Sequence, residues 1–404
     1  MELKMERKLN IAVVGIGNRG KYCFSKMLSE RTDCRIAALC DTNLHRASSA
    51  AKEFGNPPVY TDLEEMLKKE DLDGIIITTP DAFHEQCAVT ALKNNVNVLI
   101  DKPLATTVAG CKNIVKEVEK SGKIAMIGFN LRHAPILVKL KEVIDEGYIG
   151  RVIMIENSEY YNGGRTYMAR WNGKKSFSGG LWIHKGCHDF DVFNWLLDFP
   201  KPRKVTAFAG MSVFTPENYP FEIEDGIKPG PSCSECHYYK NGKCPDAAVY
   251  DADDWGKEAQ AYDGYVKDSC MYQSDMSVHD NGFAIVEYEN GVRASHSECF
   301  VTGKSFRTYT VVGTKGYASC ELHGTTVTVT KRHKNETITF EIPHADGGHA
   351  GADPGLLDSF LRAIRGEKVQ SATFEQGMMS TAIGQAAELS KEEERVVFIK
   401  ELLG

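Results

Sequence analysis

The first 125 residues alternate short hydrophobic runs with amphipathic segments. The hydrophobic runs are rich in β-branched residues and predict buried strands at Asn10–Val14, Arg35–Leu39, Gly74–Thr78, Asn97–Ile100 and Lys123–Ile127. Helical spacing with few helix breakers predicts helices between them, at Lys21–Ser29, His45–Phe54, Leu63–Lys69, Phe83–Asn94 and Val108–Ser121. This repeated strand–helix rhythm predicts an α/β Rossmann fold, a doubly wound parallel sheet.

After about Arg151 the pattern changes to longer runs in which hydrophobic and polar residues alternate. It predicts strands at Arg151–Ser158, Lys204–Phe208, Gly282–Tyr288, Val292–Glu298, Phe306–Val312, Thr325–Thr330 and Thr337–Ile342. Helices are predicted at about His188–Leu197, Leu356–Ile364 and Phe374–Lys391. We therefore expect a second, α+β domain with a large, mostly antiparallel open sheet.

The two patterns divide the chain into a dinucleotide-binding domain, residues 1–128, and a second domain, residues 129–404. The last helices are expected to pack back on the first domain. The stretch 211–273 is rich in Pro, Gly, Asp, Tyr and Cys, and it is predicted to be an insertion rather than a linker.

Composition excludes several classes of partner. The 404 residues carry 48 Lys and Arg against 55 Asp and Glu, a net charge of −7 without a long basic block, so no nucleic-acid or anionic-membrane surface is expected. The charged first residues do not resemble a signal peptide, and no apolar stretch is long enough to span a bilayer, so a cytoplasmic location is expected. The 12 cysteines are scattered along the chain, which is typical of reduced thiols.

The first predicted strand runs into Gly15-Ile16-Gly17-Asn18-Arg19-Gly20, which opens a predicted helix. In this glycine pattern Gly15 permits a tight turn, Gly17 lets the backbone approach a pyrophosphate, and Gly20 permits close helix packing. Asn18 and Arg19 are candidate cofactor residues within the loop. A tight strand-to-helix turn without a ligand is the structural alternative.

Asp41 ends the second predicted strand, 21 residues past Gly20. A carboxylate there accepts hydrogen bonds from both hydroxyls of an adenosine ribose and repels a 2′-phosphate, which favours NAD over NADP. Thr42 and Arg46 are further candidates for cofactor binding. Arg46 would partly offset the charge of Asp41, although a basic residue there is often part of a solvated helix face.

Three more short motifs follow strand ends in order: Thr78-Thr79-Pro80-Asp81 with His84, Asp101-Lys102-Pro103-Leu104-Ala105, and Gly128-Phe129-Asn130-Leu131-Arg132. With the glycine loop, Gly179-Gly180 and the segment His184-Lys185-Gly186-Cys187-His188-Asp189-Phe190-Asp191, they resemble the glucose–fructose oxidoreductase, inositol dehydrogenase and MocA (Gfo/Idh/MocA) family. The resemblance covers nearly the whole chain.

This resemblance implies a nicotinamide cofactor across the strand ends, a sugar or polyol substrate between the domains, and a homo-oligomer, a dimer or tetramer, supported by the open sheet. The cofactor side would include Thr79, Pro80, His84, Lys102 and Asn130. Candidate substrate-binding residues are Arg132, Lys185, His188 and Asp189.

Hydride transfer from an alcohol needs a base and a cation near the oxygen. By resemblance, Lys102 takes the place of the family lysine beside the reacting carbon, and His188 that of its acid–base partner. Asp101 replaces a glutamate. His184 stands where the family commonly has an aspartate, so it is a third candidate catalytic residue, and the usual relay is not fully preserved.

Four cysteines of the insertion form a separate candidate site. Cys233, Cys236, Cys244 and Cys270 have a Cys-x2-Cys hook followed by two further thiols. Such a set suits a structural zinc, which would brace a segment poor in apolar residues. Ordinary free thiols are the equal alternative.

Three functions remain open. The first is an NAD-dependent oxidoreductase that oxidises a secondary hydroxyl of a sugar, glycoside or polyol. The second is a redox-neutral glycoside-cleaving enzyme that oxidises, eliminates and re-reduces with the same NAD. The third, of another class, is a catalytically inactive dinucleotide-sensing protein, against which the retained Lys102 and His188 argue.

Overall fold

The hydrophobic runs of the first domain form a parallel sheet of six strands in the order β3-β2-β1-β4-β5-β6. The computed structural model describes residues 7–248, 255–334, 336–345, 348–369 and 371–404. The strands are β1 (Leu9–Val14), β2 (Cys34–Cys40), β3 (Val59–Tyr60), β4 (Gly74–Ile77), β5 (Asn97–Ile100) and β6 (Ala125–Ile127). The helices of this domain are α1 (Lys26–Ser29), α2 (Leu44–Glu53), α3 (Leu63–Lys69), α4 (His84–Lys93) and α5 (Val108–Ser121). The predicted Rossmann fold is confirmed.

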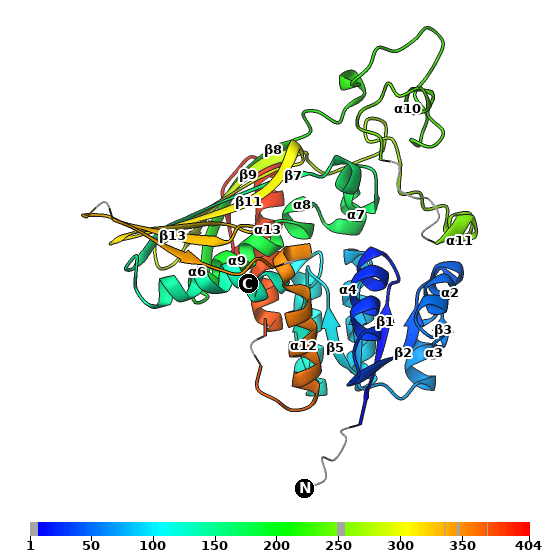
Figure 1. Ribbon diagram of the computed structural model, residues 1–404, viewed down its shortest axis with the longest axis horizontal. Helices are drawn as coiled ribbons and strands as arrows, with labels where there is room; N and C mark the ends of the chain where they lie inside the picture. The colour runs from blue at the N-terminus through cyan, green and yellow to red at the C-terminus, as the bar shows by residue number, and fades with distance from the viewer. Residues whose placement is uncertain (1–6, 249–254, 335, 346–347, 370) are drawn as a thin grey trace.

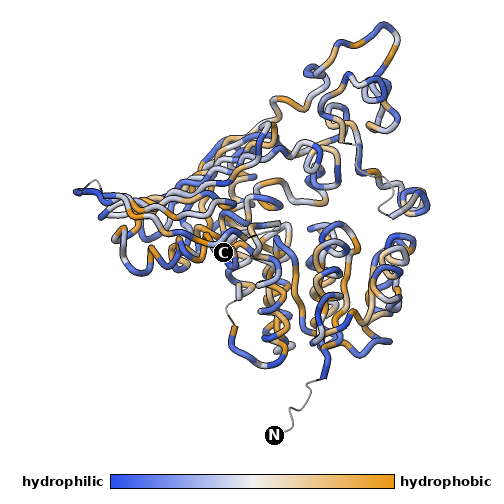
Figure 2. Tube along the Cα trace, in the orientation of Figure 1, coloured by the Kyte–Doolittle hydropathy of each residue, from blue (hydrophilic) through white to orange (hydrophobic). Residues whose placement is uncertain are grey.

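Both faces of this sheet are covered, which explains why its strands are hydrophobic along their length (Figure 2). One face packs on α4 and α5. The other packs on α12 (Asp353–Ile364), a helix from the far end of the chain whose Leu356, Leu357 and Phe360 are buried against β1 and its neighbours (Figure 1).

The second domain is built on a nine-stranded sheet in the order β14-β13-β12-β11-β7-β10-β9-β8-β15. Its strands are β7 (Val152–Asn162), β8 (Pro202–Gly210), β9 (Asn281–Tyr288), β10 (Arg293–Cys299), β11 (Val301–Gly313), β12 (Gly316–Glu321), β13 (Thr326–Lys331), β14 (Thr337–Glu341) and β15 (Val397–Phe398). Within this second sheet, β7–β10 is the only parallel pair among the described strands. The predicted mostly antiparallel sheet is confirmed.

One face of this sheet packs on α6 (Pro135–Asp145), α9 (Cys187–Leu196) and α13 (Phe374–Glu393), which together build the largest core. Two short helices, α7 (Lys175–Ser178) and α8 (Leu181–His184), lead into α9, and α14 (Lys400–Leu403) ends the chain. No helix in the described ranges combines the length and hydrophobicity needed to cross a membrane.

The insertion leaves the sheet after β8 and carries α10 (His237–Lys240) and α11 (Gly256–Asp263). It projects from the second domain and then returns, so that α11 lies beside α2 of the first domain (Figure 1). Three strands and six helices of the described residues were not predicted from the sequence, namely β3, β12 and β15, and α6, α7, α8, α10, α11 and α14. Two of these strands have only two residues, too few to show a hydrophobic period.

Candidate active site and cofactor site

The glycine loop after β1 has the geometry that its sequence predicts. Gly15 has a φ of +87°, and a Cβ there would lie 2.5 Å from the Thr79 nitrogen. A Cβ on Gly20 would lie 2.1 Å from the Gly15 oxygen, so only glycine fits at either position. A Cβ on Gly17 would meet nothing within 4 Å, which leaves open space where a dinucleotide phosphate approaches the backbone. The loop therefore fits a dinucleotide.

Arg19 and Asn130 are held together by a residue that the sequence did not indicate, Asp353 at the start of α12. Arg19 Nη1 and Nη2 each lie 3.1 Å from an Asp353 oxygen, and its Nε donates to Asp101 at 2.9 Å. Asn130 Nδ2 donates to Asp353 Oδ1 at 2.7 Å. This partly buried network joins the glycine loop, the loop after β5 and α12.

Asp41 lies at the carboxyl end of β2 and is buried. Its Oδ2 accepts from the Ile16 nitrogen at 2.7 Å, and its Oδ1 accepts from the Asn43 nitrogen at 2.8 Å and from Arg46 Nη1 at 3.0 Å. Arg46 is thus paired with Asp41 rather than solvated. Thr42 is exposed beside them.

The loop after β4 contains Thr79 and Pro80, which are partly buried, and His84, which is fully buried. The two ring nitrogens of His84 lie 2.7 Å from the Pro103 oxygen and 3.0 Å from the Thr79 oxygen. His84 therefore braces the loop after β4 against the loop after β5.

Lys102 follows β5 and reaches the second domain. Its Nζ donates to the main-chain oxygen of His184 at 2.7 Å. The His184 side chain is clamped in turn, because Asn172 Nδ2 lies 2.9 Å from its Nε2 and Asp81 Oδ2 lies 2.6 Å from its Nδ1. The amide donates to Nε2, so the proton of a neutral ring is on Nδ1 and is donated to Asp81.

His188 is buried one turn after His184, near the start of α9. Its Nδ1 has no hydrogen-bond partner in the described part of the chain. Burial, and then the neighbouring charge of Lys102, lower the pKa of His188 well below its ordinary value. A neutral His188 at physiological pH is able to accept a proton.

Lys185 is buried between aromatic and acidic side chains. Its Nζ lies 2.9 Å from Glu159 Oε1 and 5.3 Å and 5.8 Å from the ring centroids of Tyr161 and Tyr167. Arg307 pairs with the other oxygen of Glu159. The contacts of Lys185 with Glu159, which is itself paired with Arg307, therefore fix the position of the Lys185 ammonium group.

Two other candidates for substrate binding make contacts inside the protein. Asp189 accepts from the Tyr309 hydroxyl at 2.6 Å. Arg132 donates twice to Asp191, at 2.8 Å and 2.6 Å, and once to Gln376 at 2.8 Å. These contacts hold α9 between the sheet and α13.

Sequence reasoning missed several residues that the fold brings to the site: Asn172, Glu159, Arg307, His349 and Asp353. His349 packs on His188 with ring centroids 5.5 Å apart and lies 3.2 Å from Asp353 through Nδ1. No local motif surrounds these residues. Asp353, for example, lies 334 positions from its partner Arg19.

The four cysteines of the insertion are free thiols, three of them buried. The backbone joins two of their segments, since the Cys233 nitrogen donates to the Asp268 oxygen and the Cys270 nitrogen to the Pro231 oxygen, both at 2.8 Å. Burial raises the pKa of Cys233 to about 11. No three His, Cys, Asp or Glu side chains in the described ranges are placed to hold a metal ion, and a zinc site here stays a prediction.

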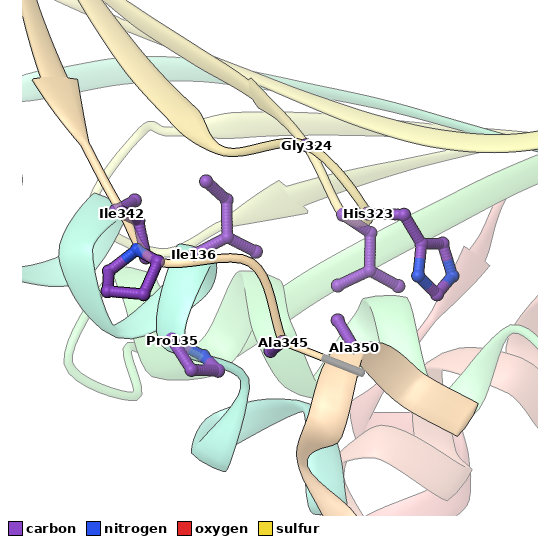
Figure 3. A pocket seen from close by; sticks show the side chains of 9 residues that line it. Pro135, Ile136, His323, Gly324, Ile342, Ala345 and Ala350 are labelled. Atoms are coloured by element: carbon purple, nitrogen blue, oxygen red, sulfur yellow. The ribbon is translucent and has the colours of Figure 1, made fainter. Parts of the chain in front are cut away.

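Two surface pockets lie away from these residues. The first lies between α6, the turn after β12 and the segment after β14, and is lined by Pro135, Ile136, His323 and Ile342 among others (Figure 3). Its volume of about 10 Å³ has room for one water molecule. The second lies between α4 and α5 on the outside of the first domain. Neither contacts Lys102 or His188.

Comparison with known proteins decides the family. Residues 9–129 match "Oxidoreductase family, NAD-binding Rossmann fold", and residues 141–399 match "Oxidoreductase family, C-terminal alpha/beta domain". The chain belongs to the Gfo/Idh/MocA family. It is 30% identical to YteT of Bacillus subtilis (strain 168), a protein named as an oxidoreductase, in an alignment of 424 positions that covers 97% of this chain and 98% of that protein. The two family models together identify this chain as an oxidoreductase with an NAD-binding Rossmann domain.

Shorter matches include inositol 2-dehydrogenase of Salmonella typhimurium (strain LT2), 30% identical over 47% of this chain and 55% of that protein. D-glucoside 3-dehydrogenase of Escherichia coli (strain K12) is 26% identical over 51% and 59% of the two chains. These two alignments span little more than half of each relative. Levoglucosan dehydrogenase, solved with NADH and levoglucosan, superimposes with a TM-score of 0.74 at 18% identity over 97% of this chain and 100% of that one. At this identity the likeness shows the fold.

Proposed function

We propose that this Gfo/Idh/MocA protein is an NAD-dependent dehydrogenase that oxidises a secondary hydroxyl of a sugar, glycoside or polyol. The observation that carries the proposal is a contact between the loop after β5 in the first domain and the segment that leads into α9 in the second. Lys102, at the carboxyl end of β5, bonds the main chain of His184, and its charge acts on His188 one turn further on. Ligands of parallel sheets bind at this edge. The names of the inositol and glucoside dehydrogenases support the substrate class.

The chemistry assigned to the pair follows from its charges. The ammonium group of Lys102 orients the substrate oxygen and stabilises negative charge that develops on it. His188 is neutral and accepts the hydroxyl proton. As the proton leaves the oxygen, the same carbon loses a hydride, which NAD accepts when bound.

The residues that would hold NAD are those of the first domain. The open space at Gly17 receives the pyrophosphate, and Asp41 faces the adenosine ribose. Thr79, Pro80 and Lys102 would line the nicotinamide end, since they follow β4 and β5 at the same edge of the sheet. The contacts of His84 with the main-chain oxygens of Thr79 and Pro103 fix the two loops that would line the nicotinamide.

The test is a panel of sugars, glycosides and polyols incubated with NAD and followed for both NADH and released aglycone. A net dehydrogenase accumulates NADH in proportion to oxidised substrate. Release of aglycone without NADH would instead identify the redox-neutral glycoside-cleaving route. Tight NAD binding with neither product, across the panel, would favour the dinucleotide sensor.

We also propose that the protein is a homo-oligomer that pairs through the outer face of the large sheet. Large hydrophobic residues are exposed on this face: Met154, Phe208, Phe283, Ile285 and Tyr317. Phe208 and Phe283 are direct neighbours on β8 and β9 and are 75% and 61% exposed. Phe208, Phe283 and Ile285 therefore form an exposed apolar cluster on β8 and β9, and such a cluster is typical of a subunit interface.

A further inference from the structure

The insertion returns to the first domain at the place where the adenosine half of a dinucleotide is expected. Asn43, which caps α2, donates through Nδ2 to the Ala259 oxygen at 2.7 Å and to Asp263 Oδ2 at 2.8 Å. The rings of His45 and Tyr262 meet edge to face, 5.6 Å apart. Helix α11 is therefore seated on α2 beside the carboxyl end of β2 (Figure 1).

This contact places a second carboxylate next to Asp41. Arg46 lies between the two, with Nη1 3.0 Å from Asp41 Oδ1 and Nη2 2.7 Å from Asp263 Oδ2. Two carboxylates and one guanidinium leave a net negative charge. Such a cluster attracts hydroxyl donors and repels a 2′-phosphate, which carries nearly two negative charges.

The insertion also brings a cation to the glycine loop. Lys267 Nζ lies 3.4 Å from Asn18 Oδ1, next to the open space at Gly17. The Trp255 ring steadies the ammonium group, whose nitrogen lies 3.3 Å from the ring centroid. A lysine at this position lies beside the backbone that receives a pyrophosphate.

We propose that Trp255, Asp263 and Lys267 form a cofactor clasp that binds the adenosine diphosphate half of NAD together with the Rossmann loop. Lys267 binds the pyrophosphate. Asp263, with Asp41, surrounds the adenosine ribose and excludes the 2′-phosphate of NADP. This inference rests on the proposed NAD dependence, and it assigns to the second domain a share of a site that Rossmann domains build alone.

Calorimetric titration of the full-length protein with ADP-ribose, NAD and NADP tests the clasp. Lys267→Ala should weaken binding of all three by about 10-fold or more, because it removes a charge-assisted hydrogen bond to phosphate. Lys267→Arg should restore most of the affinity. Asp263→Asn should tighten NADP by several-fold while NAD changes by less than about 3-fold, because only NADP meets the deleted charge.

Matched controls lie on helix α11, which also carries Asp263. Lys257→Ala and Glu258→Gln remove the same charges from exposed positions and should leave all three affinities within about 2-fold. Lys267 and Asp263 variants that behave like these controls, while the wild type binds NAD normally, would overturn the clasp and leave the proposed function intact. A wild type that binds neither ADP-ribose nor NAD would overturn both.

Discussion

Asp81 Oδ2 lies 2.6 Å from Nδ1 of His184, so a carboxyl group from the first domain reaches the histidine that stands where the family resemblance implies an aspartate. Both side chains are buried. Asp81 therefore brings a carboxyl group from another loop to the His184 ring. The main-chain oxygen of the same histidine accepts from Lys102. The pair joins the two domains beside Lys102.

Asp81→Asn should change the pH dependence of stability. Burial raises the pKa of Asp81 to about 7, so the native state keeps a proton that the unfolded state loses above about pH 4. The wild type should lose stability as pH rises from about 4 to about 7, by up to about 1.4 kcal/mol per pH unit relative to Asp81→Asn. Denaturant unfolding of both proteins across this range measures the difference. Parallel curves would show that Asp81 has no raised pKa.

His188→Asn should remove the acid limb of the kcat/KM profile and lower kcat/KM by about 10²-fold or more. In the wild type this limb should lie below pH 6.5, because burial and then the charge of Lys102 lower the pKa of His188. The measurement is the pH profile of NADH formation for both proteins. A wild-type limb at or above pH 6.5 that persists in the variant would assign the proton transfer to another group.

Asp41→Ala should raise the KM for NAD by about 10-fold or more and raise that for NADP much less. The substitution removes a ribose acceptor and also releases Arg46, which then has only Asp263 as its carboxylate partner among the contacts described. Initial rates with each cofactor give the two KM values. Equal changes for both cofactors would exclude Asp41 from cofactor selection.

Phe283→Asp should convert the proposed oligomer to monomers by placing a charge in the apolar face of the large sheet. Light scattering after size-exclusion chromatography measures the mass. Ile124→Asp, a similar change at an exposed site on the first domain, is the control and should leave the mass unchanged. A wild type that is already a monomer would refute this interface.

The fold could be predicted from the sequence to a large extent, because its signals are local. β-Branched runs and period-2 alternation identified both sheets, and the glycines at 15, 17 and 20 have the conformations or surroundings that their pattern requires. The pairing of distant residues was beyond such reasoning. Asp353 reaches Arg19 only because α12 returns to the first sheet, and Asp263 reaches Arg46 only because the insertion does.

Contacts between distant residues were equally beyond prediction at the candidate active site. The sequence indicated Lys102, His184 and His188 through a resemblance, but it could not show that His184 is clamped by Asp81 and Asn172. The spacing of the four cysteines suggested a metal, whereas the described side chains are not arranged around one. Spacing along the chain does not determine the directions of the side chains, and a metal site depends on those directions.

The most direct test of the account is the rate of NADH formation by Lys102→Met on the best substrate of the panel. Kcat should fall by at least about 10²-fold while NAD affinity stays within about 3-fold, because the ammonium group acts on the substrate oxygen and the glycine loop is untouched. Lys116→Met, an exposed control, should retain the wild-type rate. A Lys102→Met protein that keeps more than half of the wild-type kcat would remove Lys102 from the chemistry and contradict the proposed acid–base pair.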